Sequence, residues 1–233
     1  MNNSGVCFHP HWATSSIGTN IPLYFSPDFA WTPNEKPLLL IGGVHGDEPE
    51  GVTLAQKTLA WLTEIYSSGQ QSKIISPWIL IPCINVDGFN LNQRVNARGV
   101  DLNRNFPSRD WSAKSKQHRY FPGQHSSSEA ETRALIKLIT RQSPRLIIHC
   151  HSWNPGIIVT SNVSIKEAEV LAHETGYPLQ NDIGYPTPGS LGQWAWLEQK
   201  IPVICIEEQE HIDQSLVWPR FERAIMQVFG AAA

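Results

Sequence analysis

The sequence predicts an α/β domain built on a largely parallel sheet. Four short apolar runs are typical of buried strands, and they cover 38–41, 78–84, 145–151 and 202–206. Helix-like patterns separate the first three of these runs, at 51–66 and 128–141. Parallel strands need a long crossover, which a helix commonly provides, so this alternation favours parallel pairing.

Composition is that of a globular protein with one core. The chain has 233 residues, of which 41% are hydrophobic and 17% are charged, so we expect a single domain over 1–233. A net charge of −3 gives no reason to expect nucleic acid or an anionic membrane as a partner. No run of about 18 apolar residues indicates a membrane span.

The amino-terminal residues lack the features of a secretory signal. Residues 1–7 contain neither a basic region nor an apolar core. Three of the four cysteines lie within apolar, strand-like runs, as small buried side chains do. The four are Cys7, Cys83, Cys150 and Cys205. We therefore expect reduced thiols and a cytoplasmic location.

The first half of the chain contains two predicted strands on either side of a helix. Residues 1–36 are rich in Pro, Ser and Asn, with an edge strand predicted over 21–25. The strand over 38–41 leads into a helix that ends at Ser67-Ser68-Gly69. After the next strand, Asp87-Gly88 is a turn signal.

The second half alternates in the same way. Ser128-Glu129-Ala130-Glu131 has the spacing of a capping box and predicts the start of a helix. Further elements are predicted over 157–160 (strand), 165–175 (helix, ended by Gly176), 193–199 (helix) and 214–229 (helix). The last of these is amphipathic, with its apolar positions at Val217, Phe221, Ile225 and Val228.

A histidine and a glutamate follow the strand at 38–41. His45 and Glu48 stand three residues apart where a helix begins, so their side chains lie on the same side. Imidazole and carboxylate are zinc ligands. The alternative is a glycine-rich turn with a solvated carboxylate that the helix dipole favours. The position of His45 and Glu48 at the end of a strand supports the ligand interpretation, since open α/β sheets bind ligands there.

The segment 94–107 is polar and irregular. It contains three arginines, Arg94, Arg98 and Arg104, and one interior acid, Asp101. Such a segment is either a solvated surface or a clamp for an anion, because guanidinium matches carboxylate geometry. The charges alone leave both interpretations open.

Two other strands end in ionisable residues. His149 and His151 share one face of their strand and Cys150 faces the other way. His151 is the better ligand candidate because it is the last residue of its strand. It therefore lies at the carboxyl edge of the sheet, as His45 does. Glu207 and Glu208 follow the run at 202–206, and only one of them can face a given site.

Together these strand ends describe a zinc hydrolase. His45, Glu48 and His151 supply two histidines and a carboxylate for the metal, and a second glutamate is left over. Zinc lowers the pKa of a water molecule and polarises a carbonyl. The second glutamate can move a proton from that water to a leaving amine. Nearby arginines can bind a substrate carboxylate and a developing oxyanion.

The chain resembles the zinc carboxypeptidase (funnelin) family over nearly its whole length. The matching motifs stand in the family order. They are His45-Gly46-Asp47-Glu48, Asn85-Val86-Asp87-Gly88-Phe89, Arg94-Val95-Asn96, Gly99-Val100-Asp101-Leu102-Asn103-Arg104-Asn105-Phe106, Ser128-Glu129, His151-Ser152-Trp153 and Cys205-Ile206-Glu207. Within the family, the form His-Gly-Asp-Glu together with the segment 185–192 resembles the bacterial murein peptide amidase A group.

The resemblance implies a fold and a set of roles. The fold is a mixed, mostly parallel twisted sheet of about eight strands with helices on both faces, as a catalytic domain without a propeptide. One Zn²⁺ per chain is bound by the three ligands already named. Further implied roles are general base (Glu207), carbonyl-polarising arginine (Arg94), carboxylate-binding pair (Asn103 and Arg104) and mobile tyrosine (Tyr185).

Two rivals remain for these roles. Glu208 is the rival base and His149 the rival ligand; strand register and motif match favour Glu207, and the Ser152-Trp153 that follows favours His151. Asp47 is interpreted as an outer-shell or helix-start acid. Candidates for contact with the rest of the substrate are Trp153, Gln193 and Trp194.

The implied substrate is a small peptide with a free carboxylate. The murein peptide amidase group cuts the amide between γ-D-glutamate and meso-diaminopimelate during cell-wall recycling inside the cell. One alternative is an acylase that releases succinyl or acetyl from an acidic amino acid, a group that usually has an added carboxyl-terminal domain. Another is a peptide-binding protein without catalysis, against which an intact Glu207 argues. The sequence indicates no oligomeric state.

Overall fold

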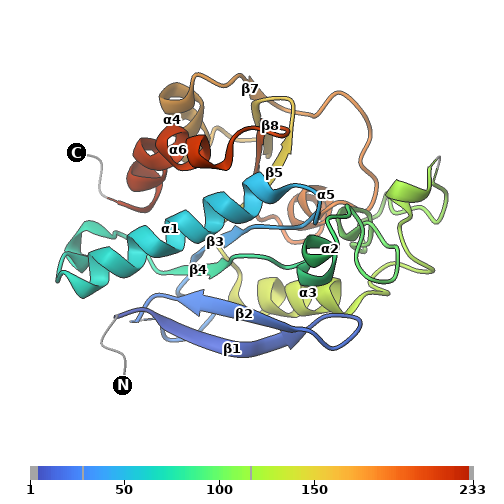
Figure 1. Cartoon of the computed structure of the whole chain (residues 1–233), viewed down its shortest axis with the longest axis horizontal. Coiled ribbons are helices and arrows are strands. Elements are labelled where there is room, and N and C mark those ends of the chain that lie inside the picture. Colours follow the sequence, from blue (N-terminus) through green and yellow to red (C-terminus); the bar gives the residue numbers. More distant parts are fainter. Residues whose placement is uncertain (1–4, 28, 116, 231–233) are drawn as a thin grey trace.

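Eight strands form one sheet in the order β1-β2-β4-β3-β5-β8-β6-β7 (Figure 1). The structure is a computed structural model that describes residues 5–27, 29–115 and 117–230. Residues 1–4, part of the segment in which no secretory signal is predicted, lie outside that range. The strands are β1 (Cys7–Thr14), β2 (Asn20–Phe25), β3 (Leu38–Ile41), β4 (Trp78–Ile81), β5 (Leu146–Trp153), β6 (Gly156–Thr160), β7 (Leu179–Gln180) and β8 (Val203–Gln209).

The centre of the sheet is parallel, as the alternation of strands and helices predicts. β3 pairs in parallel with β4 on one side and β5 on the other, and β5 pairs in parallel with β8. Antiparallel pairs join β1 to β2, β2 to β4 and β6 to β8. The mixed, mostly parallel sheet is therefore confirmed, and the strands that carry the site residues lie side by side in its centre.

Helices cover both faces of the sheet. They are α1 (Pro49–Ser67), α2 (Val86–Asn90), α3 (Ala130–Gln142), α4 (Lys166–Thr175), α5 (Leu191–Leu197) and α6 (Gln214–Phe229), with short 3₁₀ helices at Gln71–Lys73, Leu102–Arg104 and His118–Tyr120. α1, α4 and α6 pack together (Figure 1). None of the helices within the described residues is both long enough and apolar enough to cross a bilayer.

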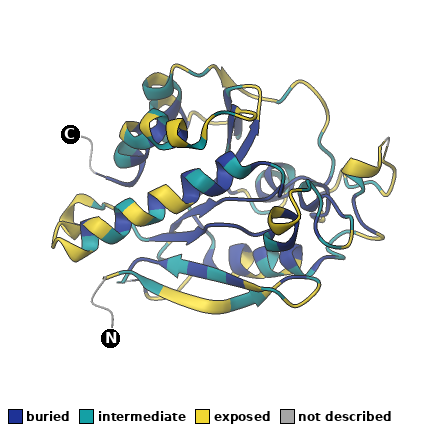
Figure 2. Ribbon diagram, in the orientation of Figure 1, coloured by how far each residue is buried: buried dark blue, intermediate teal, exposed yellow. Residues whose placement is uncertain are grey.

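The alternation of side chains along each strand produces two cores. Leu40 and Ile148 pack with Phe221 of α6 in one core, whereas Ile41 and Ile147 pack with Leu135 of α3 in the other. Figure 2 shows the central strands buried and the residues of α1 alternating between buried and exposed. Both faces are apolar because both are covered, which is why these strands are continuous apolar runs.

The amino-terminal hairpin corrects one prediction. β2, over the segment predicted as an edge strand, lies between β1 and β4, and β1 forms the edge. Ile21 and Leu23 are fully buried, as an interior strand requires. β1 escaped prediction because its middle residues, Phe8 to His11, are all exposed and show no apolar alternation. β7 and α2 are too short for a periodic pattern.

The predicted capping box does not form. α3 begins after Glu129, which makes no side-chain cap. The Ser128 hydroxyl donates to Glu129 at 2.7 Å and accepts from the Asn105 amide at 2.9 Å. The Glu131 carboxylate accepts from Ser16 at 2.7 Å. One neighbouring partner, Glu129, and two distant ones, Asn105 and Ser16, have therefore replaced the bonds that the Ser-x-x-Glu spacing suggests.

Gly46 is required by a close approach of two backbones beside the site. A Cβ at this position would lie 2.0 Å from the carbonyl carbon of Gly88. We expect Gly46→Ala to lower the free energy of unfolding by at least about 2 kcal/mol, because backbone atoms must move. Chemical denaturation measures this, with Gly156→Ala as the control, since a Cβ there meets its neighbours only at 3.4 Å. Equal stability of the two variants would contradict the prediction.

Candidate metal and substrate-binding site

Three side chains that could hold a metal ion meet at the carboxyl edge of the sheet. The Nδ1 atoms of His45 and His151 lie 2.9 Å apart. One oxygen of the Glu48 carboxylate lies 2.7 Å from His45 Nδ1 and the other lies 2.7 Å from His151 Nδ1. All three residues are buried, and one ligand atom from each lies within 4.8 Å of the others. This arrangement is suited to a cation that takes nitrogen and oxygen ligands.

The fold brings these residues together from two parallel strands. His45 lies in the turn after β3, and Glu48 immediately precedes α1. His151 lies on β5, the parallel neighbour of β3. Gly43 makes the turn possible, because its φ is +60° and a Cβ there would lie 2.6 Å from Cys83 Sγ. The three candidate ligands are thus held at the ends of neighbouring strands of the sheet.

Arg94 and Asp101 complete the surroundings of the ligands. Arg94 donates to Glu48 at 3.1 Å and to Asp101 at 3.0 Å, and the other oxygen of Asp101 lies 3.1 Å from His45 Nε2. Burial by itself raises the pKa of Asp101, but Arg94 and His45 lower it, so the group is a carboxylate. A carboxylate on the far nitrogen of His45 fixes the tautomer that leaves Nδ1 free for a metal.

Glu207 is a buried carboxyl group in the same cavity. It is 4% exposed, and its Oε2 atom has no hydrogen-bond partner among the described residues. Burial, together with the negative charge of Glu48, raises the pKa of Glu207 to about 8. Proton-transfer groups commonly show this combination of burial, a shifted pKa and a place in the wall of a cavity.

Strand register separates Glu207 from its neighbour Glu208. Glu207 lines the cavity. Glu208 points to the opposite face, where it accepts from Arg220 of α6 at 2.7 Å and from the Tyr177 hydroxyl. The rival glutamate is therefore engaged on the other side of the sheet. The same alternation buries Cys150 in the core beneath α1, between the two histidines that face the site.

A cavity of about 560 Å³ opens over the ligands. Three arginines, Arg94, Arg104 and Arg119, lie 5.1 to 5.7 Å from the centre of the Tyr120 ring and surround it. Arg94, Arg104 and Tyr120 also line the cavity, so one wall is positively charged. Arg98, by contrast, lies outside the cavity on the surface. The segment 94–107 is thus partly a cavity wall and partly a solvated surface.

The residues expected to bind substrate line this cavity too. Asn103 accepts from the backbone N–H of Leu191 at 2.9 Å, which leaves its amide donors for a ligand. Arg104 is 7% exposed. Tyr185 is 40% exposed and its ring packs edge-on against Trp153. Asn103, Arg104 and Tyr185 therefore lie around the same cavity.

Some sequence-based candidates lie elsewhere. Trp194 does not reach the cavity, because its ring is buried and stacks on Phe106 at 5.6 Å. Gln193 and Trp153 do line the cavity. Asp47 lies near Arg119, at 3.9 Å, rather than among the ligands. Consecutive residues of a helix point about 100° apart, so Gln193 can line the cavity while Trp194 packs in the core.

Comparison with known proteins identifies the family. Residues 14–162 match the family model described as zinc carboxypeptidase. The chain belongs to the zinc carboxypeptidase family. It is similar to murein peptide amidase A of Escherichia coli K12, at 32% identity over 79% of this chain and 74% of the relative. As a zinc carboxypeptidase family member with such relatives, it is a metallopeptidase or amidase.

Solved structures of the family have the same fold. Murein-tripeptide amidase MpaA from Escherichia coli O157 superposes with a TM-score of 0.74 at 28% identity, covering 98% of this chain and 93% of that one. Bovine thrombin-activatable fibrinolysis inhibitor matches with a TM-score of 0.73 at 19% identity, over 96% and 88%. The second likeness concerns the fold alone. Together they confirm the zinc carboxypeptidase architecture of this chain.

Sequence reasoning left three residues of the site without a role. Asp101 was visible as the one acid of its segment, but nothing local links it to His45. Tyr120 lies in a long loop without periodicity, and only the folded chain places it among the arginines. Cys205 was interpreted as a buried thiol of a strand, yet it lines the cavity. A strand count from Glu207 would have found it, since residues two apart share a face.

Proposed function

We propose that the protein hydrolyses an amide bond next to a carboxylate-bearing residue, and that its substrate is a murein peptide cut between γ-D-glutamate and meso-diaminopimelate. The observation that carries this proposal is the meeting of His45, Glu48 and His151 beside Glu207 in one cavity. The relatives named for murein peptides support the choice of substrate.

One zinc ion per chain fits the donor set. Both Nδ1 atoms and the Glu48 oxygens converge, and two histidines with one carboxylate are the protein ligands of many catalytic zinc sites. Burial alone would raise the pKa of Glu48, but His45 and His151 lower it well below its usual range, so the ligand is ionised. When bound, zinc supplies a Lewis acid and lowers the pKa of a water molecule.

Residues of the chain transfer the proton, stabilise the developing charge and bind the substrate. Glu207 accepts a proton from the attacking water and delivers it to the leaving amine. Arg94 stands beside the ligand Glu48, where its guanidinium can stabilise negative charge that develops on the scissile carbonyl. Asn103 and Arg104 bind the free carboxylate of the substrate, and Tyr185 closes over it from the exposed side of the cavity.

Arg104 provides a direct test of carboxylate binding. We expect Arg104→Gln to raise KM about tenfold to a hundredfold, because a charge-assisted hydrogen bond worth about 1.5–3 kcal/mol is lost. Turnover at saturating substrate should change less than KM, since the arginine binds a group remote from the scissile bond. Steady-state kinetics measure both values. The control is Arg98→Gln, whose side chain is 54% exposed and outside the cavity; an equal rise in KM for both variants would contradict the role.

The substrate class is tested by an amine-release assay on two compounds. L-Ala-γ-D-Glu-meso-diaminopimelate should be hydrolysed to L-Ala-D-Glu and diaminopimelate by protein supplied with Zn²⁺. N-succinylglutamate should react at least about a hundredfold more slowly. Preference for the succinyl compound would assign the acylase activity instead. Tight binding of the tripeptide without release of amine would assign a binding protein.

A further inference from the structure

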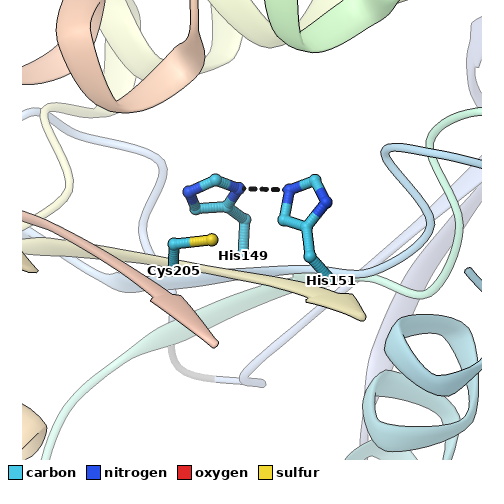
Figure 3. Close-up of side chains that lie close together, drawn as sticks. All are labelled: His149, His151 and Cys205. Carbon is cyan, nitrogen blue, oxygen red and sulfur yellow. Dashed lines mark hydrogen bonds between the residues drawn. The ribbon is translucent and has the colours of Figure 1, made fainter. Parts of the chain in front are cut away.

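A second group of metal-binding side chains adjoins the proposed zinc ligands. His149, His151 and Cys205 each offer one ligand atom, and the three atoms lie within 4.8 Å of one another. His149 and Cys205 are directly paired residues on the neighbouring strands β5 and β8. Figure 3 shows the three side chains projecting from the same side of the sheet. All three line the cavity, so an ion can reach them from solvent.

His151 belongs to both groups through its two ring nitrogens. Its Nδ1 faces Glu48 and His45, whereas its Nε2 lies 2.8 Å from His149 Nδ1 (Figure 3). Two ring nitrogens at this distance share one proton, and that proton occupies the place where a cation would bind both nitrogens.

We propose that His149, Cys205 and the Nε2 atom of His151 form a second site for a thiophilic divalent cation, adjoining the proposed zinc site. Two imidazole nitrogens and one thiolate are ligands that zinc and cadmium prefer, and oxygen-preferring cations such as magnesium do not. The proposal rests on the assignment of His151 as a ligand of the first metal.

Proton release keeps the balance of charge at this site. Binding displaces the thiol proton of Cys205 and the proton shared by His149 and His151, so one divalent cation replaces two protons. The net charge of the buried cluster is therefore unchanged, and the cost of burying an uncompensated ion does not arise. The bridging ring of His151 has to lose its last proton when the first site is filled, so the second cation binds more weakly.

Occupation of the second site would inhibit hydrolysis. Cys205 Sγ lies 3.5 Å from Glu207 Oε1, so the cation would place positive charge beside the proposed base. A carboxylate that is held by such a charge is a weaker proton acceptor. Excess cation should therefore inhibit through Cys205, at concentrations above those that fill the first site.

Cadmium titration of metal-free protein tests the site without reference to activity. Bound cadmium per chain is measured by equilibrium dialysis, and thiolate ligation by the ultraviolet sulfur-to-cadmium charge-transfer absorption. We expect about two equivalents and a charge-transfer band for the wild type. Cys205→Ser should retain the tighter equivalent and lose both the second one and the band. Cys7→Ser, which alters a half-buried thiol on the edge strand, is the matched control and should behave as the wild type.

A variant of the first site separates the two assignments. His45→Gln should lose the tighter equivalent and keep the band, because His45 belongs only to the first group. Saturation of the wild type at one equivalent without a band would overturn the second site, as would a band that survives in Cys205→Ser. Failure of the tripeptide assay would overturn the proposed substrate and leave the cadmium result standing.

Discussion

Glu207→Gln should lower turnover roughly a hundred- to ten-thousand-fold, which is the usual contribution of a positioned general base. The amide has nearly the shape of the carboxyl group and has no basic oxygen at neutral pH. Zinc content should be unchanged at about one per chain, because Glu207 is outside the group formed by His45, Glu48 and His151. Turnover is measured with the tripeptide at saturating concentration and zinc by metal analysis.

The adjacent glutamate supplies the matched control. Glu208→Gln removes a carboxylate from the same strand, but on the face that binds Arg220 and Tyr177. We expect this variant to lose some stability and to keep its turnover at temperatures well below unfolding. Full activity of Glu207→Gln, or an equal loss in both variants, would remove Glu207 from the role of base.

The sheet was predictable because its central strands are buried on both faces. Each residue from Leu38 to Ile41 is buried, so the apolar run coincides with the strand. The end of such a run marks the edge of the sheet, and His45 and Glu207 follow two of these ends. Periodicity also distinguishes Glu207 from Glu208, since neighbouring strand residues face opposite sides. Local pattern is therefore sufficient to place residues that lie on the buried central strands or shortly after them.

Contacts between distant residues were beyond such reasoning. Asp101 contacts His45 across 56 positions in the chain, and Arg94 contacts Glu48 across 46. Neither pair follows from a helix or strand period, because the loop 94–107 has none. The edge strand β1 was missed for a related reason. Pairing with β2 holds it in place, and its middle residues are exposed and show no apolar alternation. The family resemblance assigned roles to Arg94, Asn103 and Arg104. Only the folded chain shows that the three residues line the same cavity.

Glu48→Gln should abolish tight zinc binding and, with it, hydrolysis. Among the described residues, Glu48 is the one whose carboxylate hydrogen-bonds to both proposed ligand histidines, at 2.7 Å each, and it also accepts from Arg94. Loss of an outer partner of a ligand commonly costs about tenfold to a hundredfold in metal affinity, so loss of a direct ligand should cost more than about a hundredfold. Competition with a chelator measures the affinity, and the tripeptide assay measures the rate.

Glu50 makes the comparison specific, because it is another buried glutamate, two residues further along the chain in the first turn of α1. Its carboxylate accepts from Ser152 at 2.6 Å and from His211 and Gln214 at 3.1 Å, and it contacts none of the proposed ligands. Glu50→Gln should therefore reduce stability without releasing zinc. If both variants lost zinc, the effect of Glu48→Gln would reflect a loosened start of α1, and the assignment of Glu48 as a metal ligand would be wrong. If neither lost zinc, the metal would have to be held by other residues, and the adjoining group of His149, His151 and Cys205 would be the first to test.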